Sequence, residues 1–182
     1  LTFDKGVFEE LLVKSSFDFS DIQKNLAFLK GYKTEGNISS QDITEAIPKS
    51  LQDNIFDMTQ LLLRGQIQDV RELVHDLRLQ GEDEIKLIAV MLGQFRTYLQ
   101  VKLLSAQGKS EQQIVSSLSD YLSRKVNPFQ VRYAIRDSRH LSVAFLKTTI
   151  KTLVETDYQI KTGTLDKDYL LDLALLKIAS NS

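Results

Sequence analysis

Apolar side chains recur every three or four residues along almost the whole chain, and this spacing restricts the possible folds more than any other feature. The clearest case is a long stripe formed by Ile85, Ile88, Met91, Leu92, Phe95, Leu99 and Leu103. This spacing places apolar side chains on one face of an α-helix, whereas a strand requires strict alternation. No alternating run is long enough to predict a strand, so we predict an all-α fold.

Capping residues, glycines and prolines divide the apolar pattern into successive helices. Before Pro48 we expect three short helices, the second capped by Asp18 or Ser20 and closed by Gly31, at about residues 4–14, 18–29 and 40–47. The polar stretch 49–53 is expected to link them to a larger bundle. The helices of that bundle are expected at about residues 55–64, 67–80, 85–107, 111–120, 128–140, 143–162 and 167–179.

The last expected helix carries more apolar residues than one buried face requires. We expect its buried face to contain Leu170, Leu173, Leu176 and Ala174. A similar excess occurs at Leu61, Leu62 and Leu63. Helices that are apolar on two sides must bury both, so one side is available to another subunit.

Composition excludes several classes of protein. The 182 residues carry 23 Lys and Arg against 24 Asp and Glu, so no overall field attracts the chain to nucleic acid or to an anionic membrane. The absence of cysteine excludes disulfides, thiolate metal sites and cysteine nucleophiles. No uncharged apolar run reaches the roughly 20 residues that span a bilayer. We expect a cytoplasmic protein without membrane contact, and we expect further chain upstream of Leu1.

No catalytic residue, cofactor site or metal site is predicted. Gly108-Lys109-Ser110 imitates the end of a phosphate-binding loop, but that motif requires a glycine where Leu103 stands and a preceding strand. We predict instead a helix terminator followed by a helix cap. The histidines, His75 and His140, lack the converging ligands that a metal site needs.

The stretch from Arg124 to His140 is locally basic. Its cations face a single acidic residue, Asp137, and they are Arg124, Lys125, Arg132, Arg136 and Arg139. The last three are spaced to share a helix face. This face is a candidate contact for nucleic acid or for another subunit. With the helix that precedes it, the stretch could imitate a helix-turn-helix reader, although a solvated or subunit-facing basic side is the simpler interpretation.

Several ordered segments resemble the delta subunit of the bacterial DNA polymerase III clamp loader. The strongest are Asp53-Asn-Ile-Phe-Asp-Met58, Leu61-Leu-Leu-Arg-Gly65, Val74-His-Asp-Leu, Leu79-Gln-Gly81-Glu82, Ile85-Lys-Leu and Gln94-Phe-Arg96. Weaker similarities follow at Gln100-Val-Lys-Leu-Leu104, Pro128-Phe-Gln-Val-Arg132 and Lys161-Thr-Gly163. Their order and spacing are specific, although each segment alone is weak.

This resemblance implies a domain organisation and a set of partners. Residues 1–48 would form a small three-helix AAA+ lid-like domain and residues 49–182 a helical collar, while the family's nucleotide-binding-like N-terminal domain is missing. The collar would pack against the other loader subunits, delta prime and tau/gamma. The missing domain would contact the sliding clamp, and DNA would be bound by the whole complex. The chain would be a non-catalytic subunit of a DNA-directed DNA polymerase, a nucleotidyltransferase holoenzyme.

A short segment of the lid-like region agrees with a subunit that does not hydrolyse ATP. In related ATP-hydrolysing loaders an arginine senses the nucleotide, and the similar segment here is Phe17-Asp18-Phe19-Ser20-Asp21. Ser20 stands in the arginine's place. A hydroxyl cannot supply the charged fork of hydrogen bonds that arginine gives to phosphate.

Two other readings of the sequence remain open. The chain could be the lid fragment of an ATPase or transferase, which predicts ATP binding with micromolar affinity. Alternatively, it could be a free-standing helix-turn-helix module that uses Arg132 and Arg136. That module predicts sequence-specific DNA binding that persists near physiological salt.

Overall fold

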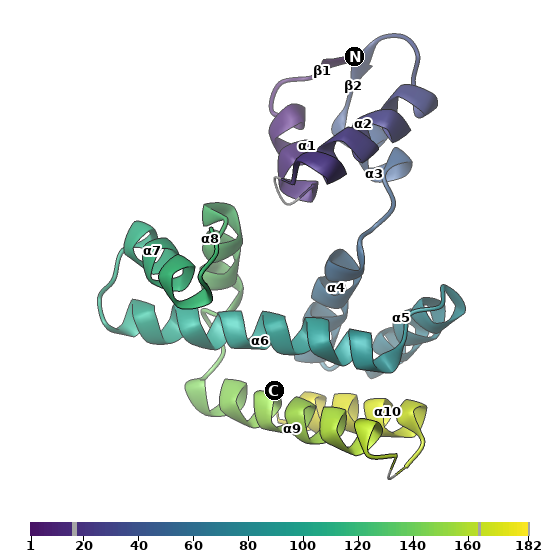
Figure 1. Ribbon diagram of the computed structural model, residues 1–182. Coiled ribbons are helices and arrows are strands. Elements are labelled where there is room, and N and C mark those ends of the chain that lie inside the picture. The colour runs from purple at the N-terminus through teal and green to yellow at the C-terminus, as the bar shows by residue number, and fades with distance from the viewer. Residues whose placement is uncertain (16–17, 164, 182) are drawn as a thin grey trace. The chain divides into compact units, whose positions relative to one another are not determined.

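The computed structural model describes residues 1–15, 18–163 and 165–181, and it is almost entirely helical (Figure 1). The predicted all-α fold is therefore confirmed. The chain divides into two compact units, an N-terminal unit of residues 1–49 and a C-terminal unit of residues 50–182. Each has its own apolar core. Among the described residues, no helix is long and apolar enough to cross a membrane.

The N-terminal unit contains three helices and a small parallel pair of strands. The helices are α1 (Val7–Lys14), α2 (Phe19–Tyr32) and α3 (Ser40–Ala46), and the strands are β1 (Thr2–Phe3) and β2 (Asn37–Ile38). Thr2 pairs with Asn37 and Phe3 with Ile38. The strands were not predicted, because two residues are too few for alternation to be detected. The core consists of Val7, Leu11, Leu29, Ile38, Ile43 and Ile47.

Two expected boundaries in this unit are wrong. α1 begins at Val7 rather than near residue 4, because Gly6 adopts a left-handed φ of 84° that no helix continues through. α2 continues through Gly31, and the chain leaves the helix only at Lys33, whose backbone is extended. Asp18 is the cap, since its carboxylate accepts a hydrogen bond from the Asp21 amide at 3.0 Å.

The C-terminal unit begins with a helix in a stretch where a linker was expected. α4 (Leu51–Leu63) starts two residues earlier than the end of the expected linker 49–53. Ser50 accepts a hydrogen bond from the Asp53 amide, and the Asp53 carboxylate accepts one from the Ser50 amide. This reciprocal capping box satisfies amides that a helix start leaves unpaired, so a polar stretch becomes helical.

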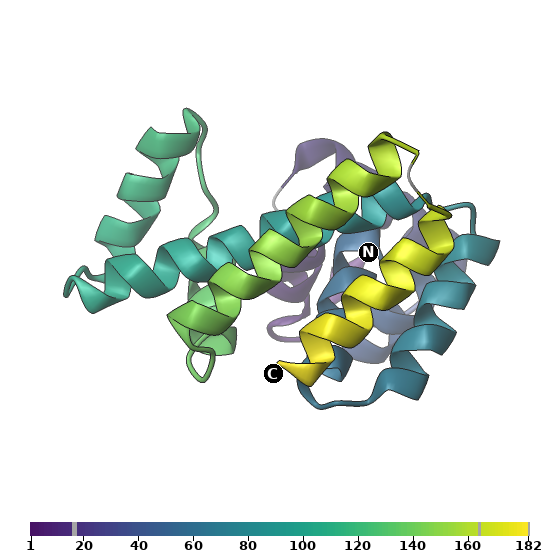
Figure 2. The ribbon, with the colours of Figure 1, turned by 90° about the horizontal axis from the view of Figure 1, so that it is seen from below.

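The remaining helices surround one long central helix (Figures 1 and 2). They are α5 (Ile67–Leu79), the central α6 (Glu84–Ala106), α7 (Glu111–Leu122), α8 (Pro128–Asp137), α9 (Val143–Lys161) and α10 (Lys167–Ser180). α9 and α10 lie side by side, and α9 packs along α6. α4 and α5 form a hairpin near the N-terminal end of α6, whereas α7 and α8 lie at its C-terminal end.

The predicted caps of the later helices are confirmed. Ser110 forms a capping box with Gln113, Asn127 caps α8 with Pro128 in the first turn, and Ser142 caps α9. Asp166 caps α10. Gly108 has a left-handed φ of 76°, so Gly108-Lys109-Ser110 is a helix terminator followed by a cap, as predicted.

The predicted buried stripes were only partly right. On α6 the buried side chains include Ile88, Met91, Leu92 and Phe95, but Leu103 is exposed, and Leu87, Tyr98 and Val101 are buried instead. α6 is contacted from several sides, so its buried surface is broader than one stripe. On α10 the buried face consists of Leu170, Leu171, Ala174, Leu175 and Ile178. Leu173 is only half-buried and Leu176 is exposed, so the predicted face was wrong for these two.

Candidate functional site

The candidate basic stretch lies on a helical hairpin formed by α7 and α8. Ser123 ends α7 with a left-handed φ of 51°. Three side-chain hydrogen bonds shape the connection between the two helices. The Ser119 hydroxyl accepts a hydrogen bond from the Val126 amide at 3.0 Å, and the Asn127 side chain accepts one from the Phe129 amide at 2.9 Å. The Ser119 hydroxyl in turn donates to the Val115 carbonyl at 2.7 Å.

The hairpin shares the core of the C-terminal unit. Its buried residues Ile114, Leu118, Val126, Val131 and Ala134 belong to the same apolar cluster as the buried residues of α6. Both α7 and α8 pack on α6. The hairpin is therefore attached through its inner face, which leaves its outer face available.

The five predicted cations are all exposed, but they do not form one face. Arg124 and Lys125 lie in the connection between the two helices, and Arg132 and Arg136 lie one turn apart on α8. α8 ends at Asp137, so Arg139 lies beyond the helix rather than on its face, and the predicted three-residue face is wrong in this respect. Ser138 is the C-cap residue of α8, and its hydroxyl donates to the Ala134 carbonyl at 2.6 Å.

Each helical arginine has an acidic and an aromatic neighbour. Arg132 forms an ion pair with Glu111 of α7, with an Nη2 to Oε1 distance of 3.0 Å, and its guanidinium lies 5.6 Å from the centre of the Phe129 ring. Glu111 was not counted in the sequence analysis, since it precedes the basic stretch. The hydrogen bond with Glu111 raises the pKa of Arg132 further above its usual range.

Arg136 repeats this arrangement one helical turn later. Its Nε lies 2.8 Å from the Asp137 carboxylate, and its guanidinium lies 5.0 Å from the centre of the Tyr133 ring. The hydrogen bond with Asp137 raises the pKa of Arg136. Tyr121, Phe129 and Tyr133 are all exposed aromatic side chains on this hairpin. Sequence reasoning missed them, although their interleaving with cations was visible.

The hairpin region carries a net positive charge. Residues 107–141 contain six Lys and Arg against three Asp and Glu, a net charge of +3, so the remaining residues carry 17 against 21, a net charge of −4. Arginines pair with phosphates and stack on aromatic rings, and exposed aromatic rings stack on bases. Arginine and aromatic residues are also enriched at protein interfaces. The surface therefore suits either nucleic acid or another protein.

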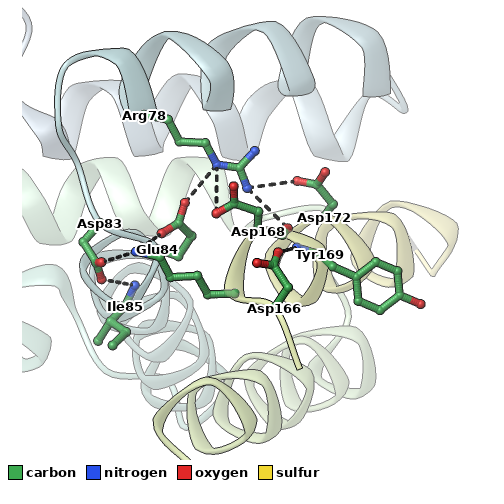
Figure 3. Close-up of polar contacts among 9 residues, drawn as sticks. Arg78, Asp83, Glu84, Ile85, Asp166, Asp168, Tyr169 and Asp172 are labelled. Atoms are coloured by element: carbon green, nitrogen blue, oxygen red, sulfur yellow. Dashed lines mark hydrogen bonds and ion pairs between the residues drawn. The ribbon is translucent and has the colours of Figure 1, made fainter. Parts of the chain in front are cut away.

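A second polar cluster lies at the opposite end of α6 (Figure 3). Glu84, in the first turn of α6, is 3% exposed. Its Oε1 lies 2.9 Å from Arg78 Nε of α5, and its Oε2 lies 2.9 Å from Lys167 Nζ of α10. Arg78 also reaches Asp172 at 3.4 Å, and Lys167 reaches Asp83 at 2.7 Å.

In this ionic cluster every charged side chain has an oppositely charged partner. Burial alone would raise the pKa of Glu84, but hydrogen bonds from Lys167, from its own backbone amide and from Arg78 together lower this pKa to about 2. The hydrogen bond with Glu84 raises the pKa of Asp168. Within the described ranges, no group of three or more side chains could hold a metal ion. The cluster ties three helices together.

The other residues considered in the sequence analysis are not brought together. His75 lies exposed on α5 and His140 lies exposed after α8. Ser20, which stands where related loaders have arginine, is exposed in the first turn of α2. Phe17, the first residue of that segment, lies outside the described residues.

Comparisons with known proteins identify relatives for both units. The model for the C-terminal domain of the DNA polymerase III delta subunit matches residues 52–178. The chain is 35% identical over 160 residues to DNA polymerase III subunit delta of Bacillus subtilis (strain 168), covering 88% of this chain and 44% of that protein. The structure is similar to the Bacillus subtilis DNA clamp loader delta protein, with a TM-score of 0.81 and 31% identity, covering 94% of this chain and 49% of that one. The chain thus spans about half the length of these relatives.

Proposed function

The chain belongs to the family of DNA polymerase III delta subunits, and from this membership we propose that it is part of a clamp-loader subunit that helps to load the sliding clamp onto DNA during replication. The observation that carries the proposal is the extent of the similarity. A solved clamp loader delta protein covers 94% of the chain, so both units have counterparts in that one relative.

The two units have different roles in this proposal. Residues 1–48 are the AAA+ lid-like domain, and residues 49–182 are the collar that joins the loader ring. The partners are delta prime and tau/gamma through the collar, the sliding clamp through the family's N-terminal domain, and DNA within the complex. The subunit is non-catalytic and acts in the cytoplasm, without a cofactor of its own.

An exposed apolar stripe supports a role of the collar in assembly. Tyr169, Leu173 and Leu176 follow one another at spacings of four and three residues on α10, opposite its buried face. Tyr169 is 56% exposed and Leu176 39% exposed. Aromatic and aliphatic side chains that remain exposed on one helix face are typical of a surface that another protein covers.

Reconstitution of the loader tests the proposal. The complete protein, mixed with the other loader subunits and the clamp of the same organism, is expected to co-elute with them in size-exclusion chromatography. If it elutes alone, the proposal is wrong. The double variant Tyr169→Asp with Leu176→Asp is expected to weaken assembly at least about tenfold, because it places charges in a desolvated interface. Val154→Asp, at an exposed apolar residue of α9, is the matched control.

We also propose that the α7–α8 hairpin contacts DNA within the assembled loader. The local charge of +3 and the paired arginine and aromatic side chains support this contact. Removing a phosphate-binding cation reduces the slope of log affinity against log salt by about one. Arg132→Ala and Arg136→Ala are therefore expected to weaken binding to primed DNA and to flatten its salt dependence, whereas Lys151→Ala on α9 is not.

The same variants distinguish DNA from a protein partner at the hairpin. If Arg132→Ala and Arg136→Ala reduce assembly with the other subunits and leave DNA binding by the assembled fraction unchanged, the hairpin is a subunit contact. Calorimetry with ATP tests the ATPase alternative. Micromolar binding of ATP to this chain would contradict a subunit without nucleotide chemistry.

A further inference from the structure

Lys102 links the central helix α6 to the corner that follows α8, which consists of residues 138–141. Its ammonium group donates to the Ser138 carbonyl at 3.2 Å and to the Arg139 carbonyl at 3.1 Å. These carbonyls lie just beyond the end of α8, where unpaired carbonyl groups give a helix its negative pole. A cation there is stabilising, but in this case it comes from another helix, α6.

The corner is otherwise fixed by short-range contacts. Ser138 is 2% exposed, and its carbonyl also accepts a hydrogen bond from the Leu141 amide at 3.0 Å. One turn before Lys102 on α6, Tyr98 is buried close enough to Arg136 and Asp137 for their charges to influence its pKa, although burial is the main reason why that pKa is raised to about 12. Lys102 therefore supports the end of α8 that carries Arg136.

Apolar burial alone does not determine the orientation of the hairpin. Hydrophobic contact is non-directional, whereas charge-assisted hydrogen bonds to two carbonyls constrain both distance and direction. Lys102 forms no ion pair among the residues that the structure describes, and its two hydrogen bonds both go to this corner. Its ammonium group is thus bonded to the backbone of this corner and not to a carboxylate.

We propose that Lys102 is the positioning residue that sets the direction in which Arg136 and Arg139 point from the hairpin. This inference rests on the proposed contact between the hairpin and DNA. Lys102 itself does not touch DNA in this arrangement. Its loss lets the corner move, so that the arginines meet the phosphates less often in the correct geometry.

The test compares Lys102→Met with Lys102→Arg in the complete protein, assembled with the other loader subunits. Methionine keeps the length and apolar stem but donates no hydrogen bond, whereas arginine keeps the charge and the donors. Lys102→Met is expected to weaken binding to primed DNA about five- to tenfold, because the arginines then meet the phosphates less often. Lys102→Arg is expected to bind within about twofold of wild type.

A second measurement follows the corner itself. Amide hydrogen exchange in residues 138–141 is expected to become at least about tenfold faster in Lys102→Met and to stay near wild type in Lys102→Arg. Unchanged exchange in Lys102→Met overturns the proposal, whatever the hairpin binds. Weaker DNA binding without faster exchange would mean that Lys102 contacts a phosphate directly.

Failure of the proposed DNA contact has a different signature. If Arg132→Ala and Arg136→Ala leave DNA binding unchanged, the hairpin does not contact DNA. If those variants weaken DNA binding and Lys102→Met does not, the DNA contact stands and the positioning role of Lys102 is wrong.

Discussion

The two ends of α6 use charge in opposite ways. At the N-terminal end, Glu84 is buried and is bonded by cations from α5 and α10. At the C-terminal end, Arg132 and Arg136 are exposed, and each has a carboxylate neighbour from its own hairpin. Buried, fully paired charges hold helices in register, whereas exposed arginines with weak partners can exchange them for a ligand. The comparison indicates that the first end serves stability, and we propose that the second serves recognition.

The largest expected effect is at the buried end. Glu84→Gln removes the charge that Arg78 and Lys167 share, so we expect a loss of about 3 kcal/mol in the free energy of unfolding. Urea denaturation of the complete protein measures this loss. Glu82→Gln is the matched control. Among the described residues the Glu82 carboxylate forms only an i, i+4 pair with Lys86, so this change is expected to alter stability by about 0.5 kcal/mol or less. Equal effects of the two changes would remove the distinction between the two ends.

Acid titration is the next test of the buried end. The pKa of Glu84 is lowered to about 2 in the folded protein, so the folded state holds the charged form more tightly than the unfolded state does. Its contribution is therefore fully present above the unfolded pKa of about 4.3 and is lost as the pH falls towards 2. We expect the stability difference between wild type and Glu84→Gln to be constant from pH 7 to pH 5.5 and to shrink below pH 4. A constant difference down to pH 2.5 would contradict this assignment.

A smaller effect on stability is expected in the connection between α7 and α8. Ser119→Ala removes the acceptor of the Val126 amide, and Val126 is 8% exposed. Leaving a nearly buried amide unpaired costs about 1 to 2 kcal/mol. Faster amide exchange across residues 119–131, with little change in α4 and α5, is the expected observation. Ser117→Ala is the control, because within the described part of the chain the Ser117 hydroxyl is bonded only by the Lys109 ammonium group. Equal exchange in both variants would show that the turn does not depend on Ser119.

The smallest expected effect concerns DNA affinity at the hairpin. Glu111→Gln frees Arg132 from its carboxylate, so the affinity of the assembled loader for primed DNA is expected to rise about two- to threefold, while stability changes by less than about 0.5 kcal/mol. Asp120→Asn on the same helix makes the same change in net charge without releasing Arg132. If both variants raise the affinity equally, only net charge matters and the Glu111 pair has no specific role.

Local sequence signals predicted the helix caps well but the buried faces only in part. Ser110 with Gln113, Asn127 with Pro128, and Asp166 each act within a few residues, so the sequence contains the whole interaction. The burial of Tyr98 and the exposure of Leu176 depend on which neighbours cover α6 and α10. Spacing along one helix cannot report that, because a helix contacted on several sides buries more than one stripe.

The candidate site was predictable in composition but not in geometry. The cations of the hairpin were identified from local charge, whereas the pairing of Arg132 with Glu111 joins residues 21 positions apart. The ionic cluster was not foreseen at all, since Arg78, Glu84 and Lys167 come from three helices and share no motif. Long-range ion pairs leave no periodic trace in a sequence.

Both ends lie on a single uninterrupted helix, so α6 sets the spacing between the ionic cluster and the hairpin. A helix of 23 residues is roughly 34 Å long at about 1.5 Å per residue. α9 packs along α6, and α4, α8 and α10 also contact it, so the neighbouring helices hold the two groups of charges at this separation.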